Sequence, residues 1–356
     1  MNALREPDEP HAEGARTPRA HGFHWPAEWE PHRATWLAWP HNRETWPRSL
    51  EAAEEAYEAM VRALQGAETV CITVPDAARE ERVRRRLASA GLERGVELHV
   101  IPTDDAWIRD HGPIFLRGAA GESALVDFGF DAWGKKYPPW ERDDAVPRAV
   151  AAARGVRRFE AGFVLEGGSV DGDGEGTVLT TESCLLHPNR EAGRTRALME
   201  ARLRDFLGAE RVLWLGDGIA GDDTDGHVDD VARFVGAATV VAVAEADASD
   251  PNHAPLAETL RRLRAMRDAR GRRLSVVELP MPPPLEVDGA RCPASYANFY
   301  LANGRALVPV FDAPSDARAL AILRECLPGR EVVPIRARDL VVGLGAVHCL
   351  TQQEPA

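Results

Sequence analysis

The sequence predicts an α/β protein built by repeating a strand-rich unit. Short strands follow one another in twos and threes between single helices, and this rhythm returns four or five times along the chain. The glycine fingerprint of a dinucleotide-binding fold is absent, so a Rossmann fold has no support. An apolar content of 44% is sufficient for a packed core.

Apolar periodicity and end signals place the individual elements. Helices are expected at 51–64 with Ser49 as N-cap, and at 76–90, 143–153, 192–207, 255–270 and 315–327. Strands are expected at 69–74, 96–101, 113–116, 124–128, 212–215, 232–235, 239–243, 274–279, 296–301 and 306–310, with a hairpin across 170–180 and strands near Val332 and Val347. Residues 1–22 are expected to be a disordered extension.

The net charge and the composition indicate which kinds of molecule this protein could bind. The chain has 56 acidic and 43 basic side chains, a net charge of -13, which disfavours nucleic acid and anionic membranes and favours cationic ligands. No apolar run reaches the length of a membrane span, and the first twenty residues lack the apolar stretch of a signal peptide. We therefore expect a cytoplasmic protein.

The cysteines argue against a disulfide framework or a zinc knuckle. They are odd in number, far apart and without a CxxC pair, at positions 71, 184, 292, 326 and 349. Cys71 lies in an expected strand and is interpreted as a small buried hydrophobe. Cys349 follows a glycine-rich approach and precedes Thr351-Gln352-Gln353. Taken alone, a nucleophile and a buried structural cysteine are equally good interpretations of Cys349.

Two loops combine an acid with features that suit a planar cation. In 104–113, Trp107 stands among aspartates that include Asp110; an indole face attracts a cation, and aspartate oxygens accept paired hydrogen bonds from a guanidinium. An ion pair between Arg109 and an aspartate, holding a turn, explains this loop equally well. In 165–169, Glu166 precedes two glycines, which let the backbone approach whatever the carboxylate holds.

The next segment resembles a calcium loop. Six residues fall on positions 1, 3, 5, 6, 8 and 12 of an EF-hand loop: Asp171, Asp173, Glu175, Gly176, Val178 and Glu182. The flanking residues are glycine-rich or β-branched rather than helical, so a hairpin turn is favoured. An acidic calcium-binding protein remains the alternative from another functional class.

A third loop surrounds His227 with aspartates at 222, 223, 225, 229 and 230. His227 and Asp229 are two residues apart, so on an extended segment they point to the same face. The chain has no HExxH or HxH grouping, which disfavours a hydrolytic zinc site. A carboxylate-only magnesium or calcium site stays open, although it gives His227 no role.

Residues 293–304 look like scaffold. Their aromatic alternation predicts a strand, and Asn303-Gly304 predicts a tight turn into the next one. The other loops together offer a thiol, an imidazole, a glutamate and two aspartates beside a tryptophan. That set suits attack of a thiolate on a guanidinium carbon held by carboxylates, with histidine protonating the departing ammonia and then activating water.

These motifs resemble those of the agmatine deiminase family. The segments are Trp-Ile-Arg-Asp-x-Gly-Pro at 107–113, Leu-Glu-Gly-Gly-Ser at 165–169, Thr-Asp-Gly-His-Val-Asp at 224–229, Ala-Ser-Tyr-x-Asn-Phe-Tyr at 294–300 and His-Cys-Leu-Thr-Gln-Gln at 348–353. The family is part of the guanidine-modifying pentein superfamily and is related to bacterial peptidyl-arginine deiminases. The likeness runs in order from Trp25 to the C-terminus.

The resemblance implies a single catalytic domain over 23–356, a five-bladed pseudo-symmetric α/β propeller of ββαβ units. It implies hydrolysis of agmatine to N-carbamoylputrescine and ammonia in putrescine and polyamine biosynthesis, through a covalent cysteine intermediate and without metal or cofactor. The implied partner is a small cationic guanidine, with no nucleic acid or membrane; a homo-oligomer is left open.

Carried over by position, the resemblance makes Cys349 the nucleophile and His227 the general acid and base. Asp110 and Asp229 then bind the guanidinium, and Glu166 holds it while orienting His227. Trp107 is expected to shape the pocket.

Two positions depart from the family pattern: Asp230, where asparagine is common, and 343–346, where Gly-Leu-Gly-Ala replaces Gly-Gly-Gly-Asn. Both lie beside the pocket, so they bear on the substrate more than on the chemistry. Free arginine and peptidyl-arginine are the alternative substrates.

Overall fold

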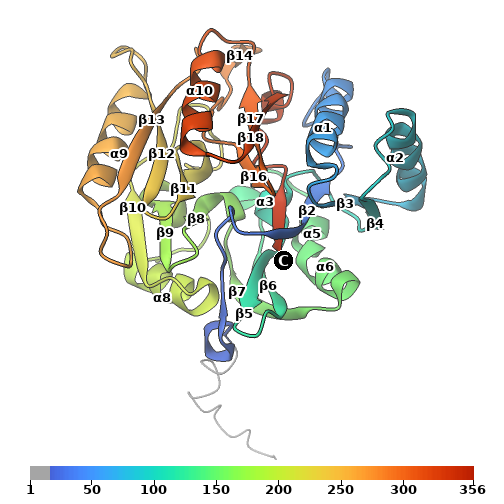
Figure 1. The fold of residues 1–356 in the computed structure, drawn as a ribbon, viewed down its shortest axis with the longest axis horizontal. Helices are drawn as coiled ribbons and strands as arrows, with labels where there is room; N and C mark the ends of the chain where they lie inside the picture. Colours follow the sequence, from blue (N-terminus) through green and yellow to red (C-terminus); the bar gives the residue numbers. More distant parts are fainter. Residues whose placement is uncertain (1–16) are drawn as a thin grey trace, which may run out of the picture.

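Five small sheets follow one another around a common centre, and the longer helices lie on the outside (Figure 1). This computed structural model describes residues 17–356. A separate two-stranded hairpin, β14 (Glu286–Val287) and β15 (Ala290–Arg291), completes the described sheets. The expected α/β class with repeated strand-rich units is confirmed.

The five sheets share one topology. In each, an antiparallel pair of strands is followed by a parallel pair. A helix on the outer side connects the strands of each parallel pair, because parallel neighbours need a crossover connection. The unit is therefore strand, strand, helix, strand, as the resemblance implied.

The bounds of the elements are as follows. The first sheet orders β19 (Gln352–Pro355), β2 (His32–Ala38), β3 (Thr69–Val74) and β4 (Val96–Val100), with α1 (Leu50–Leu64) and α2 (Ala77–Ser89). The second orders β1 (Phe23–His24), β5 (Ile114–Gly118), β6 (Ser123–Gly129) and β7 (Arg157–Val164), with α6 (Val146–Arg154). The third contains β8 (Val170–Gly172), β9 (Thr177–Thr181) and β10 (Arg211–Leu215), with α8 (Arg196–Leu207). The fourth contains β11 (Ala232–Gly236), β12 (Thr239–Ala244) and β13 (Ser275–Pro280), with α9 (His253–Ala265). The fifth contains β16 (Tyr300–Ala302), β17 (Arg305–Val310) and β18 (Glu331–Arg336), with α10 (Asp316–Cys326).

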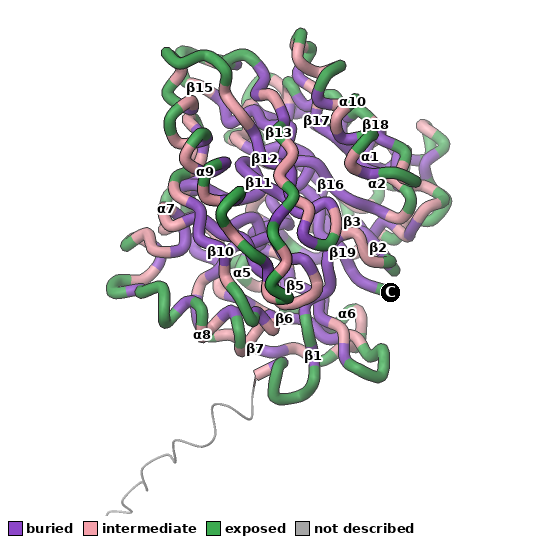
Figure 2. Tube along the Cα trace, turned by 60° about the vertical axis from the view of Figure 1, so that its left-hand side comes forward, coloured by how far each residue is buried: buried purple, intermediate pink, exposed green. Residues whose placement is uncertain are grey.

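The central strands of the sheets form the core. Residues 240–243 of β12 and 306–308 of β17 are continuous apolar runs that are almost fully buried, as expected for strands covered on both faces. Figure 2 shows buried backbone running through the strands, while exposed residues concentrate in loops and on the outer sides of helices. The interior of the ring is thus rigid enough to position the loops that connect one sheet to the next.

Capping side chains mark the starts of α2 and α8, whereas Ser49, the expected cap of α1, precedes that helix without a side-chain capping hydrogen bond. Asp76 accepts a hydrogen bond from the backbone N of Arg79 at 2.7 Å, and α2 starts at the next residue. Helix α8 begins at residue 196 rather than 192, because Thr195 is the capping residue. Helix α9 ends at Ala265 instead of 270, since residues beyond it turn through Asp268, which accepts from the backbone N of Arg272.

Two expected strands were wrong. Strand β16 begins only at Tyr300, because the preceding segment turns where the Ser295 hydroxyl accepts from the backbone N of Ala297. No strand forms at Val347, whose carbonyl oxygen accepts from the backbone N of Leu350 in a turn. The sequence also gave no indication of β2, β7 or β19. In β19 the polar residues 352–354 are buried through hydrogen bonds, so apolar alternation does not reveal this strand.

The calcium-like segment is the β8–β9 hairpin, as favoured from the sequence. Its acids already have partners in the protein. Asp171 accepts from Arg233 Nε at 2.6 Å, and Asp173 accepts from the backbone N of residues 175 and 177. Glu182 pairs with Arg262 at 2.6 Å. The acids of this loop therefore already bind arginine side chains and backbone amides. This arrangement does not favour the calcium-binding alternative.

The expected extension, 1–22, lies largely outside the described residues. Its last part is described, and Arg19–His21 form a 3-10 turn closed by Gly22 at φ 77°. Ordered structure therefore starts before the expected boundary at 23. Within the described part of the chain, no helix combines the length and the apolar character needed to cross a membrane.

Candidate active site

All five connections from one sheet to the next contribute a segment to one region. These segments are α3 (Ile108–His111), the 3-10 turn η3 (Gly167–Ser169), the 3-10 turn η4 (Val228–Asp230), residues 295–299 and the turn at 346–351. Each precedes the first strand of a sheet: β5, β8, β11, β16 and β19. The repeated topology therefore brings together residues that are far apart in the sequence.

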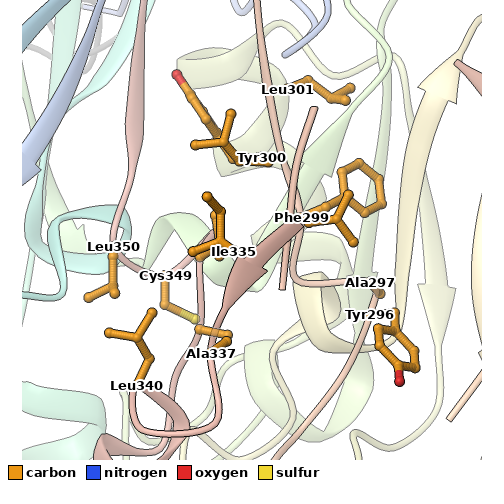
Figure 3. Close-up of a cluster of buried hydrophobic side chains, with 14 of the residues drawn as sticks. Tyr296, Ala297, Phe299, Tyr300, Leu301, Ile335, Ala337, Leu340, Cys349 and Leu350 are labelled. Atoms are coloured by element: carbon orange, nitrogen blue, oxygen red, sulfur yellow. The ribbon is translucent and has the colours of Figure 1, made fainter. Parts of the chain in front are cut away.

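Cys349 lies in the turn between the 3-10 turn η5 (Val341–Gly343) and β19, and it lines a cavity of about 950 Å³. Apolar side chains pack behind it, with Ala337, Leu340 and Leu350 beside it in Figure 3. Burial raises the pKa of the Cys349 thiol well above its ordinary value, and three nearby carboxylates raise it further. The thiol is therefore protonated until a positive charge enters the cavity.

Two polar groups contact the sulfur. Asn298 Nδ2 lies 3.2 Å from Sγ, and Asp229 Oδ2 lies 3.9 Å from it. The Asn298 side-chain oxygen also accepts from the backbone N of His348 at 2.9 Å. Asn298 thus fixes both the turn and the thiol. The segment was expected to be scaffold, and aromatic alternation around Asn298 concealed this role.

His227 is buried just before η4. Its backbone N donates to Asp222 Oδ2 at 3.0 Å, and its Nδ1 lies 3.6 Å from Asp110 Oδ1. Burial opposes a charge on the ring, but the Asp110 carboxylate and neighbouring Cys184 outweigh it and raise the pKa of His227 well above its ordinary value. Nε2 has no hydrogen-bond partner among the described residues. The ring is thus a charged acid with one nitrogen unengaged.

Glu166 forms a buried ion pair with Arg190. Arg190 Nε donates to Glu166 Oε1 at 2.8 Å, and the same guanidinium bonds the Thr224 carbonyl oxygen at 2.7 Å and the Asp225 carboxylate. Burial alone would raise the pKa of Glu166, yet Arg190 and His227 lower it below its ordinary value. Arg190 therefore keeps Glu166 ionised and joins it to the loop that carries His227. Sequence inspection gave no role to Arg190.

Asp110 is fixed by two uncharged donors. The backbone N of Gly168 donates to Oδ1 at 2.9 Å, and Trp133 Nε1 donates to Oδ2 at 3.0 Å. Burial raises the pKa of Asp110 to about 6 against the effect of His227, because Asp229 and Glu166 add negative charge nearby. Within residues 17–356, Asp110 thus has no arginine partner, so its charge balance is left to His227 and to an incoming cation.

Asp229 on η4 is fully buried, and its two carboxylate oxygens have different surroundings. Oδ2 lies 2.7 Å from His348 Nδ1, whereas Oδ1 has no hydrogen-bond partner among the described residues. Burial would raise the pKa of Asp229, but the bond and charge of His348 lower it below its ordinary value. Asp229 Oδ1 is therefore a buried acceptor that the described residues leave unpaired.

Gly168 lies at the point where these side chains converge. A Cβ atom at this position would be 2.6 Å from His227 Nδ1, 2.8 Å from Asp110 Oδ1 and 3.0 Å from Asp229 Oδ2. Only glycine leaves room for all three. The second glycine of the 165–169 motif is thus required by close approach, as the sequence suggested.

The cavity wall includes Trp107, which is 5% exposed and stacks at 5.4 Å on Trp46. A Cβ at Gly345 would lie 2.4 Å from the Trp107 ring, so this glycine keeps the indole in place. Further acids in the lining are Glu44, Asp104, Asp105, Asp143 and Asp223. The cations in the lining are Arg43 and Lys136, and the Lys136 ammonium is bound to Asp225 at 2.7 Å. Negative charge therefore prevails in the cavity.

Most of the remaining acids in the loop around His227 bind partners within the protein, with one exception. Asp222 caps the loop backbone, Asp225 binds Arg190 and Lys136, and Asp230 bonds Asn298 at 3.0 Å. The exception is Asp223, which lines the cavity and accepts from the Tyr137 hydroxyl. The side chain of Asp223 therefore forms part of the cavity wall.

The chain matches proteins of one family over almost its whole length. The family model for the Porphyromonas-type peptidyl-arginine deiminase matches residues 24–355. The chain belongs to this family. It is 42% identical to the agmatine deiminase of Ectopseudomonas mendocina, an alignment that covers 96% of this chain and 97% of that protein.

Solved structures of agmatine deiminases share the fold. The agmatine deiminase of Enterococcus faecalis superposes with a TM-score of 0.90 at 34% identity, covering 95% of this chain and 97% of that one. The C315S agmatine deiminase of C. jejuni with substrate bound gives a TM-score of 0.85 at 29% identity, covering 94% and 96%. The resemblance to agmatine deiminases is therefore confirmed at the level of sequence and fold.

Two groups of side chains within the described residues have metal-ligand spacing. Glu166, Cys184 and His227 bring one donor atom each within 4.8 Å of one another, as do Cys71, Glu97 and His99. An arginine already engages each group: Arg190 binds Glu166, and Arg154 lies 3.1 Å from Glu97. The residues therefore fit internal ion pairs better than a resident cation.

Substitution of Gly168 by alanine tests the convergence of the site. The added methyl displaces His227 and Asp110, so kcat/KM should fall by about 100-fold or more, since misplacement near 1 Å has that effect. Gly236→Ala is the matched control, because a Cβ at Gly236 meets nothing within 4 Å. Steady-state kinetics with a guanidine substrate measures both. Equal activity of the two folded variants would contradict the geometry.

The pH dependence tests the state of Asp110. A protonated Asp110 cannot attract a guanidinium, and its pKa is about 6, so kcat/KM should decline as the pH falls below about 6. The decline should approach roughly tenfold per pH unit. The exposed Asp247 provides the control: Asp247→Asn should keep the same acid limb. A profile that stays flat between pH 7 and about 5 would refute this assignment.

Proposed function

We propose that this chain is an agmatine deiminase that hydrolyses agmatine to N-carbamoylputrescine and ammonia. The observation that carries the proposal is that Cys349 and Asp110 line one cavity rich in carboxylates, with Asp229 Oδ2 at 3.9 Å from the Cys349 sulfur. Curated relatives that are 39–42% identical over 96% of this chain have the same activity in their names. The reaction belongs to putrescine and polyamine biosynthesis, and we place it in the cytoplasm.

Binding comes first and prepares the nucleophile. The guanidinium lies between the Asp110 and Asp229 carboxylates, which accept its N–H groups in pairs, and Trp107 closes one side. The charge of the substrate offsets the carboxylates that hold the pKa of the Cys349 thiol high, so the thiol loses its proton to solvent as the cation enters. The substrate thus generates the thiolate that attacks it.

The first half of the reaction breaks a C–N bond. The Cys349 thiolate adds to the guanidinium carbon and forms a C–S bond. The protonated His227 donates its proton to the nitrogen that leaves, and ammonia departs. An S-alkylthiouronium remains on Cys349, with Glu166 and Asp229 facing its positive charge.

The second half uses water. His227, now neutral, takes a proton from a water molecule, and the resulting hydroxide adds to the same carbon. The C–S bond breaks, the proton of the added hydroxyl passes to solvent, N-carbamoylputrescine leaves, and Cys349 returns as a thiolate. The proton taken from water stays on His227, whose pKa is raised, and serves the next turnover.

The lining of the cavity favours agmatine over arginine. Agmatine has an ammonium-bearing chain with no carboxylate, whereas free arginine would bring its carboxylate towards Asp104, Asp223 and the other lining acids. Lys136 is already bound to Asp225 and offers little compensation. We assign the terminal ammonium of agmatine to the Asp223 side of the cavity.

Ammonia release from three substrates tests the proposal. Wild-type protein should release ammonia from agmatine and at least tenfold less efficiently from free arginine and a blocked arginine peptide. Free arginine brings a carboxylate towards the lining acids, and the blocked peptide lacks the ammonium that these acids would pair with. Cys349→Ser should lose activity by several orders of magnitude, since the nucleophile is removed.

The Cys71→Ser variant, at a buried cysteine of β3 away from the site, is the matched cysteine control, with circular dichroism to verify folding. Turnover that survives Cys349→Ser would refute the covalent mechanism. Preference for arginine or its peptide would refute the substrate assignment alone.

A further inference from the structure

His348 bridges two carboxylates behind the nucleophile. Its Nδ1 lies 2.7 Å from Asp229 Oδ2, and its Nε2 lies 2.8 Å from Glu28 Oε2. The imidazole is 2% exposed, and the two carboxylates are 0% and 6% exposed. Glu28 comes from the chain before β2, so this bridge joins residues 320 positions apart.

The pKa values of Glu28 and Asp229 are both lowered, and with both carboxylates ionised, both ring nitrogens must donate for this bridge to form. An ionised carboxylate offers only acceptors, and a neutral imidazole has a single N–H, so it can satisfy only one of the two carboxylates. A second carboxylate facing a bare ring nitrogen would place two lone pairs against each other in a buried site. The imidazolium, with N–H on each side, satisfies both contacts.

The charge balance of the surrounding cluster requires the same state. Arg109 NH2 lies 3.2 Å from Glu28, and Arg233 forms ion pairs with Glu28 at 2.8 Å and with Asp171 at 2.6 Å. The ionisable groups of this buried cluster are Glu28, Asp171, Asp229, Arg109, Arg233 and His348. Three carboxylates against two guanidiniums leave one negative charge, which a protonated His348 cancels. Buried charge is tolerated only when it is paired in this way.

We propose that His348 is a positioning residue with a fixed positive charge, which keeps the Asp229 carboxylate ionised and turned towards the substrate guanidinium. This inference rests on the proposed function. His348 does not contact the reacting atoms in this account. It acts through Asp229, whose Oδ2 it occupies while Oδ1 stays available.

The neighbouring Asp230 supplies an internal comparison. Both aspartates are buried on η4, but Asp230 bonds the neutral Asn298 amide at 3.0 Å instead of an imidazole. Burial and the charge of Asp229 raise the pKa of Asp230 well above its ordinary value, whereas the pKa of Asp229 is lowered. Of two adjacent acids, the one that faces His348 is the one that keeps its charge.

The two histidines of the site therefore have different tasks. Both nitrogens of His348 are occupied by carboxylates, so neither is free to exchange a proton with the substrate. His227, by contrast, has an unengaged Nε2. Proton transfer is left to His227, and His348 supplies constant electrostatic support.

Nitrogen-15 NMR of the histidine side chains tests the charge directly in the full-length protein at neutral pH, without substrate. His348→Gln identifies the signals of His348. The expected spectrum shows two protonated nitrogens for this ring in the wild type. One unprotonated nitrogen would overturn the proposal. This readout depends neither on the folding of a variant nor on the identity of the substrate.

Kinetics tests the consequence for binding. In folded His348→Gln, KM for agmatine should rise by at least about tenfold, with a smaller change in kcat, because the guanidinium loses an ionised and oriented partner. Glu28→Gln, which never reaches the cavity, should shift KM in the same direction. His253→Gln, at the start of α9, is the control and should change neither constant.

An unchanged KM in folded His348→Gln would overturn the positioning role. Should the wild type not act on agmatine at all, the proposed function fails, while the NMR spectrum still decides the charge of His348.

Discussion

Several carboxylates buried around one thiol set the requirement that the rest of this structure meets. Burial of an unpaired charge is costly, and removal of one partner of a buried ion pair costs about 3–5 kcal/mol. Glu166 is balanced by Arg190 and Asp229 by His348. Asp110 has neutral donors and His227 at 3.6 Å, so its balance is incomplete. A bound guanidinium would complete the charge balance of Asp110. The missing positive charge is what makes the cavity selective for a cation.

The repeated fold is what allows this concentration of charge. Each link between consecutive sheets carries a few polar residues to the same region, and packed apolar strands hold the links in place. No single link contains the whole site: Asp110, His227 and Cys349 come from three different ones. Because each support, such as Arg190 or Glu28, is anchored in yet another segment, the site is rigid before the substrate arrives, as electrostatic catalysis requires.

The same arrangement explains how much of the molecule could be predicted from its sequence. Strand 69–74 was recognised with its correct bounds, because an apolar β-branched run is a local signal. Cys349, His227, Glu166, Asp110 and Asp229 each lie in a short motif, and the structure brings them together. Local pattern and family resemblance were sufficient for these.

Residues that support the site could not be predicted, because their roles exist only across long separations. Glu28 acts on His348 from 320 positions away, and Asn298 acts on Cys349 from 51. Strand β19 was missed since its buried residues are polar and satisfied by distant partners. The Asn298 segment was misjudged because aromatic alternation, which is a sound indicator of strands, also occurs in a turn whose hydroxyl and amide side chains bend the backbone.

The covalent intermediate on Cys349 tests the central claim most directly. His227→Ala should slow the release of the intermediate, because the residue that activates water is missing. Incubation of this variant with agmatine, an acid quench and peptide mass spectrometry should reveal the mass of agmatine less ammonia on the peptide that contains Cys349. The modification on Cys184 or another cysteine, or full turnover in this variant with no modification of Cys349, would contradict the account.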